Sequence, residues 1–214
     1  MSYFTIKEEA EARFEEKKST FIGRVKRINT EVEAKKFINS IKEKEKEARH
    51  NVYAYIIGEN MNIQRYSDDG EPQGSAGIPI LEVIKKNKIT DVAVVVTRYF
   101  GGILLGKGGL FRAYSKAASL AIENGQVIEK VLGVELNIVI NYEDVDKVRY
   151  AFKKNSWRIE KVDYSDKVSI LVYCDIKTSD SIINKVIELT RGKCQVIVSD
   201  EEYYFKTEDK LYKE

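Results

Sequence analysis

The spacing of hydrophobic residues in the first 130 positions predicts a mixture of strands and helices. Residues 91–100 are β-branched nearly throughout, which is typical of a strand buried on both faces. Further strands are predicted at residues 19–28, 51–58 and 61–66. Helical spacing begins after Thr30, where Thr30 and Glu33 form a capping-box pattern, and it returns at residues 78–86 and 110–123.

Beyond residue 130 the pattern predicts the order β-α-β-β-α-β, the split βαβ arrangement of ferredoxin-like domains. The strands are predicted at residues 134–141, 157–164, 167–176 and 195–199, with residues 203–206 as an extension of the last. The helices are predicted at residues 143–154 and 179–190. We therefore expect an α+β protein of two domains, residues 1–130 and 131–214, with a linker near residues 129–133.

Composition limits the classes of function. The chain has 214 residues, of which 43% are hydrophobic and 33% charged, as in ordinary globular proteins. Its 36 basic and 34 acidic side chains leave a formal net charge of +2. The chain as a whole therefore has no strong attraction for nucleic acid or an anionic membrane, and any basic surface must come from local clustering.

The cysteines and the apolar runs predict a compartment. Cys174 and Cys194 are too few and too far apart in sequence for a disulfide framework, so we interpret them as reduced thiols. The first residues lack the apolar stretch of a signal peptide, and no apolar run approaches the roughly 20 residues of a membrane-spanning helix. The sequence predicts a cytoplasmic protein with no membrane partner.

Most of the glycines, eight of 13, fall in two neighbouring blocks, and the first block is acidic. Residues 67–79 place Asp68, Asp69 and Glu71 within four positions. One hypothesis is a Mg²⁺ site in this acidic loop, because Mg²⁺ usually takes one or two carboxylates and keeps several waters. The alternative, which the turn composition favours, is a turn whose aspartates accept hydrogen bonds from main-chain amides nearby and in the next helix.

In the second block, residues 94–114, a hydrophobic strand runs through glycines into a helix. Main-chain amides at a helix N-terminus carry partial positive charge and suit a phosphate. The candidate phosphate- or nucleic-acid-binding residues are Arg98, Lys107, Gly108, Gly109 and Arg112. The spacing matches neither the P-loop nor the dinucleotide fingerprint. Glycines required by tight strand-to-helix packing are an equal alternative.

His50 is the only histidine of the chain and precedes a predicted strand. It is an auxiliary candidate as an acid, a base or a phosphate donor, because histidine titrates near neutral pH. A structural histidine held by hydrogen bonds is the alternative. No serine-nucleophile motif accompanies it, so the sequence names no catalytic residue and no established metal ligand.

Three separated blocks resemble the YigZ/IMPACT family and occur in the order typical of that family. The first contains Ala48-Arg49-His50 and Tyr53-Ala54-Tyr55, and the others are residues 68–79 and 96–114. The resemblance is specific over residues 15–125 and weaker beyond them. At Lys107 the sequence departs from the family's Gly-x-Gly-Gly motif, in which a small or uncharged residue is expected.

The resemblance implies a bacterial or archaeal YigZ-type protein with two domains. The first would be an α/β sandwich like domain 2 of ribosomal protein S5, and the second would be ferredoxin-like. Both folds occur in the translocating elongation factor. Eukaryotic IMPACT proteins bind the activator of a kinase that phosphorylates a translation initiation factor, so the resemblance also implies a role in the control of translation.

These observations lead to three hypotheses of function. The first is a translation-associated protein without enzymatic activity or cofactor, which binds RNA, the ribosome or a regulatory protein partner through the glycine-opened helix. The second is an enzyme that acts on a phosphorylated or nucleotide-like small molecule with Mg²⁺ in the acidic loop. The third is a pure protein-interaction module. The first is preferred, although fold analogy alone is a weak basis for function.

Overall fold

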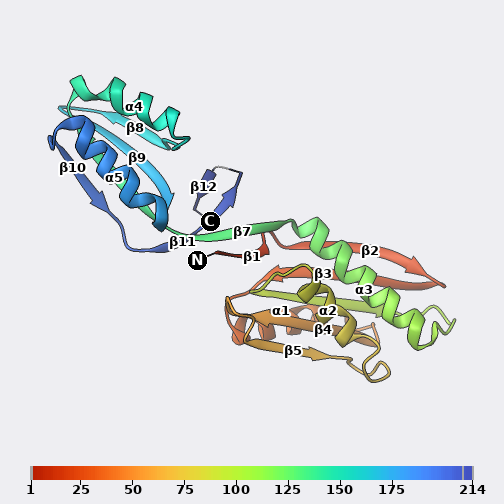
Figure 1. Ribbon diagram of the computed structural model, residues 1–214. Helices are drawn as coiled ribbons and strands as arrows, with labels where there is room; N and C mark the ends of the chain where they lie inside the picture. Colours follow the sequence, from red (N-terminus) through yellow and green to blue (C-terminus); the bar gives the residue numbers. More distant parts are fainter. Residues whose placement is uncertain (1, 209, 214) are drawn as a thin grey trace. The chain divides into compact units, whose positions relative to one another are not determined.

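The computed structural model describes residues 2–208 and 210–213, and the chain divides into two compact units (Figure 1). The larger unit is Tyr3–Ile128, and the smaller one consists of Ser2 and the described residues from Glu129 onward. The change of unit falls inside strand β7 (Val127–Ile140), so the expected linker at residues 129–133 is wrong. Those residues are strand because they pair with strand β11 (Glu202–Thr207), about 70 positions further along the chain.

The larger unit is built on an antiparallel sheet with the strand order β2-β3-β6-β4-β5. The strands of this region are β1 (Ser2–Ile6), β2 (Ala10–Glu16), β3 (Ser19–Arg27), β4 (His50–Ile57), β5 (Ile63–Ser67) and β6 (Val92–Tyr99). The helices are α1 (Glu31–Lys44), α2 (Gly77–Lys86) and α3 (Gly106–Gly125). The predicted strands and helices of this region are all present, but β1 and β2 were not predicted, and α3 begins four residues earlier than expected.

Helices cover both faces of this sheet, with α1 on one face and α2 and α3 on the other. The central strand β6 is buried on both faces, as its β-branched sequence predicted. Val95 packs with Phe37 of α1, whereas Val94 and Val96 belong to the core beneath α2 and α3. Gly23 of β3 lets α3 approach closely, because a Cβ there would lie 2.3 Å from the Ala117 carbonyl oxygen.

The capping box predicted for α1 is confirmed, and it supports a test of local stability. Thr30 Oγ1 accepts a hydrogen bond from Glu33 N at 3.2 Å, and Glu33 Oε2 accepts one from Asn29 N at 2.8 Å. We expect Thr30→Ala to lower the free energy of unfolding by about 1 kcal/mol, because one amide of the first turn loses its partner. Urea unfolding followed by circular dichroism measures this. Thr30→Ser, which keeps the hydroxyl, should remain close to the parent, and an unchanged Thr30→Ala would contradict the assignment.

The smaller unit has the β-α-β-β-α-β order that the sequence predicted. Its elements are β7, a short 3₁₀ turn (Tyr142–Asp144), α4 (Val145–Lys154), β8 (Lys161–Tyr164), β9 (Val168–Asp175), α5 (Ile176–Thr190) and β10 (Cys194–Val198), followed by β11 and β12 (Lys210–Tyr212). The antiparallel strand order β10-β7-β9-β8 is that of a ferredoxin-like domain. The α+β class is therefore confirmed.

Strand β11 refines the prediction that residues 203–206 extend the last strand. β10 pairs with β7 as far as Val198 opposite Leu136, and β11 resumes pairing with Glu202 opposite Gly133. The two strands therefore follow the same edge of β7 with an interruption between them. β11 then turns into a hairpin with β12, which the sequence pattern did not predict.

Candidate functional site

The two glycine-rich blocks meet at one pocket of the larger unit, with a volume of about 320 Å³. The start of β4, the acidic block, the end of β6 and the first turn of α3 form its walls. The residues that line it are Arg49, His50, Glu71, Pro72, Arg98, Phe100, Leu104, Leu105, Gly106, Lys107 and Leu110. Folding thus gathers candidates from every predicted group: Glu71 of the acidic loop, His50, and Arg98 and Lys107 of the second glycine-rich block.

A buried ion pair forms the floor of this pocket. Glu71 Oε1 accepts hydrogen bonds from Arg98 Nη1 at 2.7 Å and from the Tyr114 hydroxyl at 2.8 Å. The exposed fractions of the Glu71 and Arg98 side chains are only 3% and 6%. Burial, together with the adjacent Glu71 carboxylate, raises the pKa of Tyr114. Tyr114 therefore stays a neutral donor, and Arg98 compensates the charge of Glu71.

Arg98 also connects the ion pair to the aromatic residues of the site. Its guanidinium carbon lies 5.5 Å from the Phe21 ring centroid and 5.4 Å from that of Phe100. Within the described part of the chain, Arg98 Nε is buried without a hydrogen-bond partner. These contacts fix the guanidinium between two rings at the end of β6.

His50 lies at the pocket wall, where one of its two ring nitrogens has a hydrogen-bond partner. Its Nδ1 lies 2.9 Å from the Asp69 carbonyl oxygen, which holds the ring. Its Nε2 lies 4.0 Å from Glu71 Oε1 at the pocket wall. The side chain is hydrogen-bonded as a structural histidine would be, and it remains within reach of a ligand in the pocket.

Asp68 closes the acidic turn by accepting main-chain hydrogen bonds. Its carboxylate receives the amides of Gly74, Ala76 and Gly77 at 2.8–3.1 Å. Gly77 is the first residue of α2, whose preceding residue Ala76 makes no capping hydrogen bond through its side chain. This is the arrangement of the turn alternative, in which an aspartate satisfies amides of its own loop and of the next helix.

The three carboxylates of the acidic block do not converge. Asp69 binds Lys42 Nζ at 2.6 Å and the Asn51 amide at 2.7 Å, whereas Glu71 turns to Arg98 and Asp68 to the main chain. Among the described residues, no group of three histidines, cysteines or acidic residues is arranged to hold a metal ion. This donor set does not fit Mg²⁺, so we derive no chemistry from a metal here.

The cationic candidates fall into two adjoining pockets on either side of the first turn of α3. The helix begins at Gly106, so Lys107, Gly108 and Gly109 lie within its first turn instead of preceding it. Arg98 and Lys107 line the pocket of about 320 Å³. Gly109 and Arg112 line a second pocket of about 250 Å³, and Gly108, between Lys107 and Gly109 in the chain, lines neither pocket.

Several residues of this region were not predicted as candidates. They are cationic or apolar, and they are Lys17, Arg49, Phe100, Leu104 and Lys116. Arg49 adjoins His50 in the first family block, which was the available signal for it. Lys116 lies in α3 four residues after Arg112, so helical spacing was the available signal for it, whereas Lys17 comes from a distant part of the sequence with no local pattern that connects it to α3.

The loop between β6 and α3 is apolar yet exposed. Leu104 is 81% exposed, and Phe100, Ile103 and, within α3, Phe111 are each at least 40% exposed. Gly101 pins this loop to the β2–β3 turn, because a Cβ there would lie 1.9 Å from the Lys18 carbonyl oxygen. Exposed apolar side chains beside cations are typical of a binding surface.

The sequence contains no apolar run of the length that a membrane-spanning helix needs. None of the helices in the described residues combines the length and the apolar character that crossing a membrane requires.

Comparison with known proteins matches one family model to each of the two units of the chain. The family model of the Impact N-terminal domain matches residues 17–122, and that of a domain of unknown function, DUF1949, matches residues 138–193. The chain is similar to the IMPACT family member YvyE of Bacillus subtilis (strain 168), with 41% identity over 91% of this chain and 90% of that protein.

A second bacterial relative and a solved structure agree. The IMPACT family member YigZ of Escherichia coli (strain K12) is 30% identical over 86% of this chain and 92% of its own. A crystal structure of a hypothetical protein superposes with a TM-score of 0.60 at 28% identity, covering 94% of this chain and 98% of that one. Because such relatives match both units and nearly the whole chain, the protein belongs to the IMPACT family.

Proposed function

We propose that this protein is a translation-associated protein that binds RNA, and that the RNA backbone follows the surface around the first turn of α3. We call this the α3 surface and define it by the residues that line the two adjoining pockets together with Phe111 of α3. The resemblance implies that eukaryotic IMPACT proteins regulate translation, and this supports a role in translation for this protein. The observation that carries the proposal is the local excess of positive charge.

Six cations line the two pockets against two carboxylates. The cations are Lys17, Arg49, Arg98, Lys107, Arg112 and Lys116. The carboxylates are Glu16 and Glu71, and Arg98 already compensates Glu71 at 2.7 Å. In a chain of net charge +2, such clustering supplies a basic surface that the whole protein lacks.

The α3 surface also offers groups that stack on bases. The rings of Phe100 and Phe111 are 41% and 46% exposed. Proteins that bind single-stranded nucleic acid without strong sequence preference combine cations along the backbone with aromatic rings beneath the bases. We therefore expect single-stranded RNA to bind more tightly than duplex RNA.

The test is a titration of single-stranded and structured RNA at two salt concentrations. We expect Lys107→Ala/Arg112→Ala to weaken binding and to lower the slope of log K against log[salt] by about 2, one for each lost phosphate contact. The matched control is Lys35→Ala/Lys36→Ala, two exposed lysines of α1 on the opposite face of the sheet. It removes the same charge elsewhere and should bind like the parent.

Two results would contradict this proposal. One is the absence of RNA binding at low salt, and the other is equal binding by the α3 variant and the parent. Protein partners that are retained after nuclease treatment, in the absence of RNA binding, would favour the protein-interaction alternative. The enzyme alternative required the two glycine-rich blocks to meet, as they do, but also Mg²⁺ in the acidic loop, where each carboxylate is bound to a cation or to main-chain amides.

A further inference from the structure

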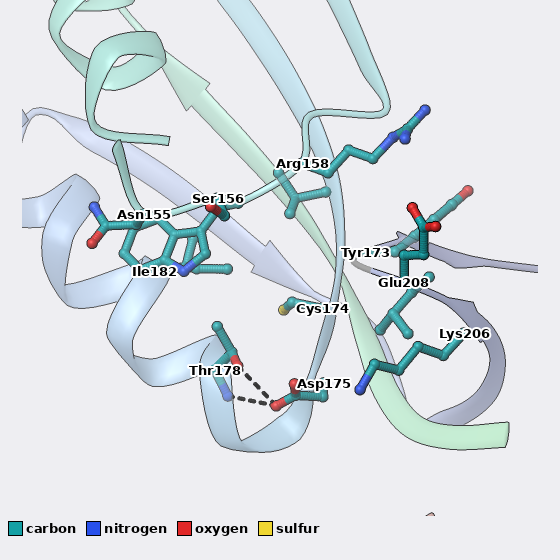
Figure 2. Close-up of a pocket in the computed structure, with 13 residues that line it drawn as sticks. Asn155, Ser156, Arg158, Tyr173, Cys174, Asp175, Thr178, Ile182, Lys206 and Glu208 are labelled. Atoms are coloured by element: carbon teal, nitrogen blue, oxygen red, sulfur yellow. Dashed lines mark hydrogen bonds between the residues drawn. The ribbon is translucent and has the colours of Figure 1, made fainter. Parts of the chain in front are cut away.

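The smaller unit contains another cavity of about 320 Å³, beside the end of β9 (Figure 2). Four consecutive strand residues, 172–175, line it. Successive residues of a strand point to opposite faces of its sheet, so a cavity that all four line lies against the edge of the strand. The loop at residues 155–158, the start of α5 and the β11–β12 hairpin form the other walls.

In the described part of the chain, no strand pairs by hydrogen bonds with this edge of β9, although β12 lies near it. β8 pairs with β9 only as far as Lys161 opposite Leu171, and the Glu160 amide donates to the Leu171 carbonyl at 2.9 Å. Main-chain groups on one edge recur every second residue, so the N–H and C=O of Tyr173 face the same way as those of Leu171. The cavity wall therefore presents a main-chain donor and acceptor side by side.

Apolar side chains form one part of the cavity lining, beside the polar Asn155, Ser156 and Thr178. This apolar part consists of Trp157, Val172, Ile182 and Leu211 together with Cys174. Burial, with a smaller effect from the adjacent Asp175 carboxylate, raises the pKa of the Cys174 thiol to about 12, so the thiol is neutral at physiological pH. A hollow with these walls accepts an aliphatic or thioether side chain.

The rim carries charges of both signs. Its cations are Arg158 and Lys206, and its carboxylates are Asp175 and Glu208. Figure 2 shows Lys206 and Glu208 on the side of the hairpin, with Cys174 between them and the loop on the other side. Arg158 Nε lies 3.3 Å from Glu160 Oε1, and Lys206 Nζ lies 3.5 Å from Glu129 Oε2. Neither of these carboxylates lines the cavity. Asp175 already accepts from Thr178 N and Oγ1, so a ligand with one positive and one negative group would face Glu208 and Lys206.

We propose that this cavity binds a free α-amino acid with an apolar side chain of about the size of leucine or methionine. The α-carboxylate accepts from the Tyr173 amide and lies near Lys206, while the α-ammonium donates to the Tyr173 carbonyl and lies near Glu208. The side chain enters the hollow beside Trp157. The volume lies at the small end of ligand pockets, about 300–1,000 Å³, and suits so small a ligand.

This proposal is independent of RNA binding and has its own probe, because Trp157 is the only tryptophan of the chain. We expect L-leucine and L-methionine to change the Trp157 fluorescence in a saturable manner. The comparison compounds are 3-methylbutylamine and 4-methylpentanoate, which keep the leucine side chain but each lack one of the two charges. Both should bind at least about tenfold more weakly than leucine, because a charged hydrogen-bonding group is left unmatched.

Substitutions at the rim test the contacts of the ligand's two charged groups one at a time. Lys206→Gln should weaken leucine binding about tenfold while leaving 3-methylbutylamine unaffected, because the amine has no carboxylate. Lys185→Gln, an exposed charge change on α5 outside the cavity, is the matched control and should bind like the parent. No saturable change with leucine or methionine up to about 10 mM, or equal binding of the two single-charge compounds and leucine, would overturn the proposal.

Discussion

Replacing Glu71 with alanine is expected to destabilise the unit Tyr3–Ile128 by about 3–5 kcal/mol, the largest effect of any single substitution considered for this protein. Glu71 accepts from both Arg98 and Tyr114, and the Arg98 side chain is only 6% exposed. Removing the carboxylate leaves a buried guanidinium without its counter-charge and a buried hydroxyl without its acceptor. The loss far exceeds that of an exposed ion pair, which contributes about 0–1 kcal/mol.

The two units allow this effect to be located. Trp157 lies in the smaller unit, so its fluorescence follows unfolding there, whereas far-ultraviolet circular dichroism follows both units. Glu71→Ala should lower the urea concentration at which the larger unit unfolds, as followed by circular dichroism. The urea concentration of the Trp157 fluorescence transition should stay unchanged.

A double variant provides the control for this substitution. Glu71→Leu/Arg98→Met removes both charges and should recover most of the lost stability, because replacing a whole buried pair by apolar residues is often neutral. If Glu71→Ala unfolds at the same urea concentration as the parent, the buried ion pair does not support this unit.

Asp68→Ala should lower the free energy of unfolding of the same unit by about 2–3 kcal/mol. The Asp68 carboxylate accepts three main-chain amides at 2.8–3.1 Å, and two of them, from Ala76 and Gly77, belong to the start of α2. Hydrogen bonds to a charged acceptor contribute about 1.5–3 kcal/mol, and loss of a helix cap alone costs about 1 kcal/mol. Thermal and urea unfolding measure the difference.

This substitution also distinguishes a structural acidic turn from a metal site. Asp68→Asn keeps one carbonyl acceptor and should lose less stability than Asp68→Ala. Adding Mg²⁺ should leave the Tm of the parent unchanged, because a ligand stabilises a protein only if it binds the native state. A rise in Tm with Mg²⁺ that disappears in Asp68→Asn would show instead that the loop binds the ion.

Local patterns predicted the elements well wherever a segment's own residues decide its structure. The β-branched run of β6, the Thr30–Glu33 capping box and the helical spacing of α5 all specify their conformation within a few residues. The order of elements after residue 130 then limited the smaller unit to very few arrangements, and the ferredoxin-like one was found.

Errors arose where a distant segment provides the deciding partner. Residues 129–133 have no strong pattern of their own, and they are strand because β11 pairs with them. For the acidic block the sequence left two alternatives open, a turn, which its composition favoured, and a Mg²⁺ site. The fold directs Asp69 to Lys42, Glu71 to Arg98, and Asp68 to main-chain amides, which is the arrangement of the turn.

The sequence by itself determined the family, the α+β class and the two clusters of glycine around which the site is built, because short motifs and local periodicity encode these. Only the tertiary structure decided how the charges are grouped. It placed Arg98 and Lys107 in one pocket, and it joined Arg112 to Lys17 and Lys116 in the next. Lys17 is about 95 positions from Arg112, and the two meet only when the β2–β3 turn and α3 pack together.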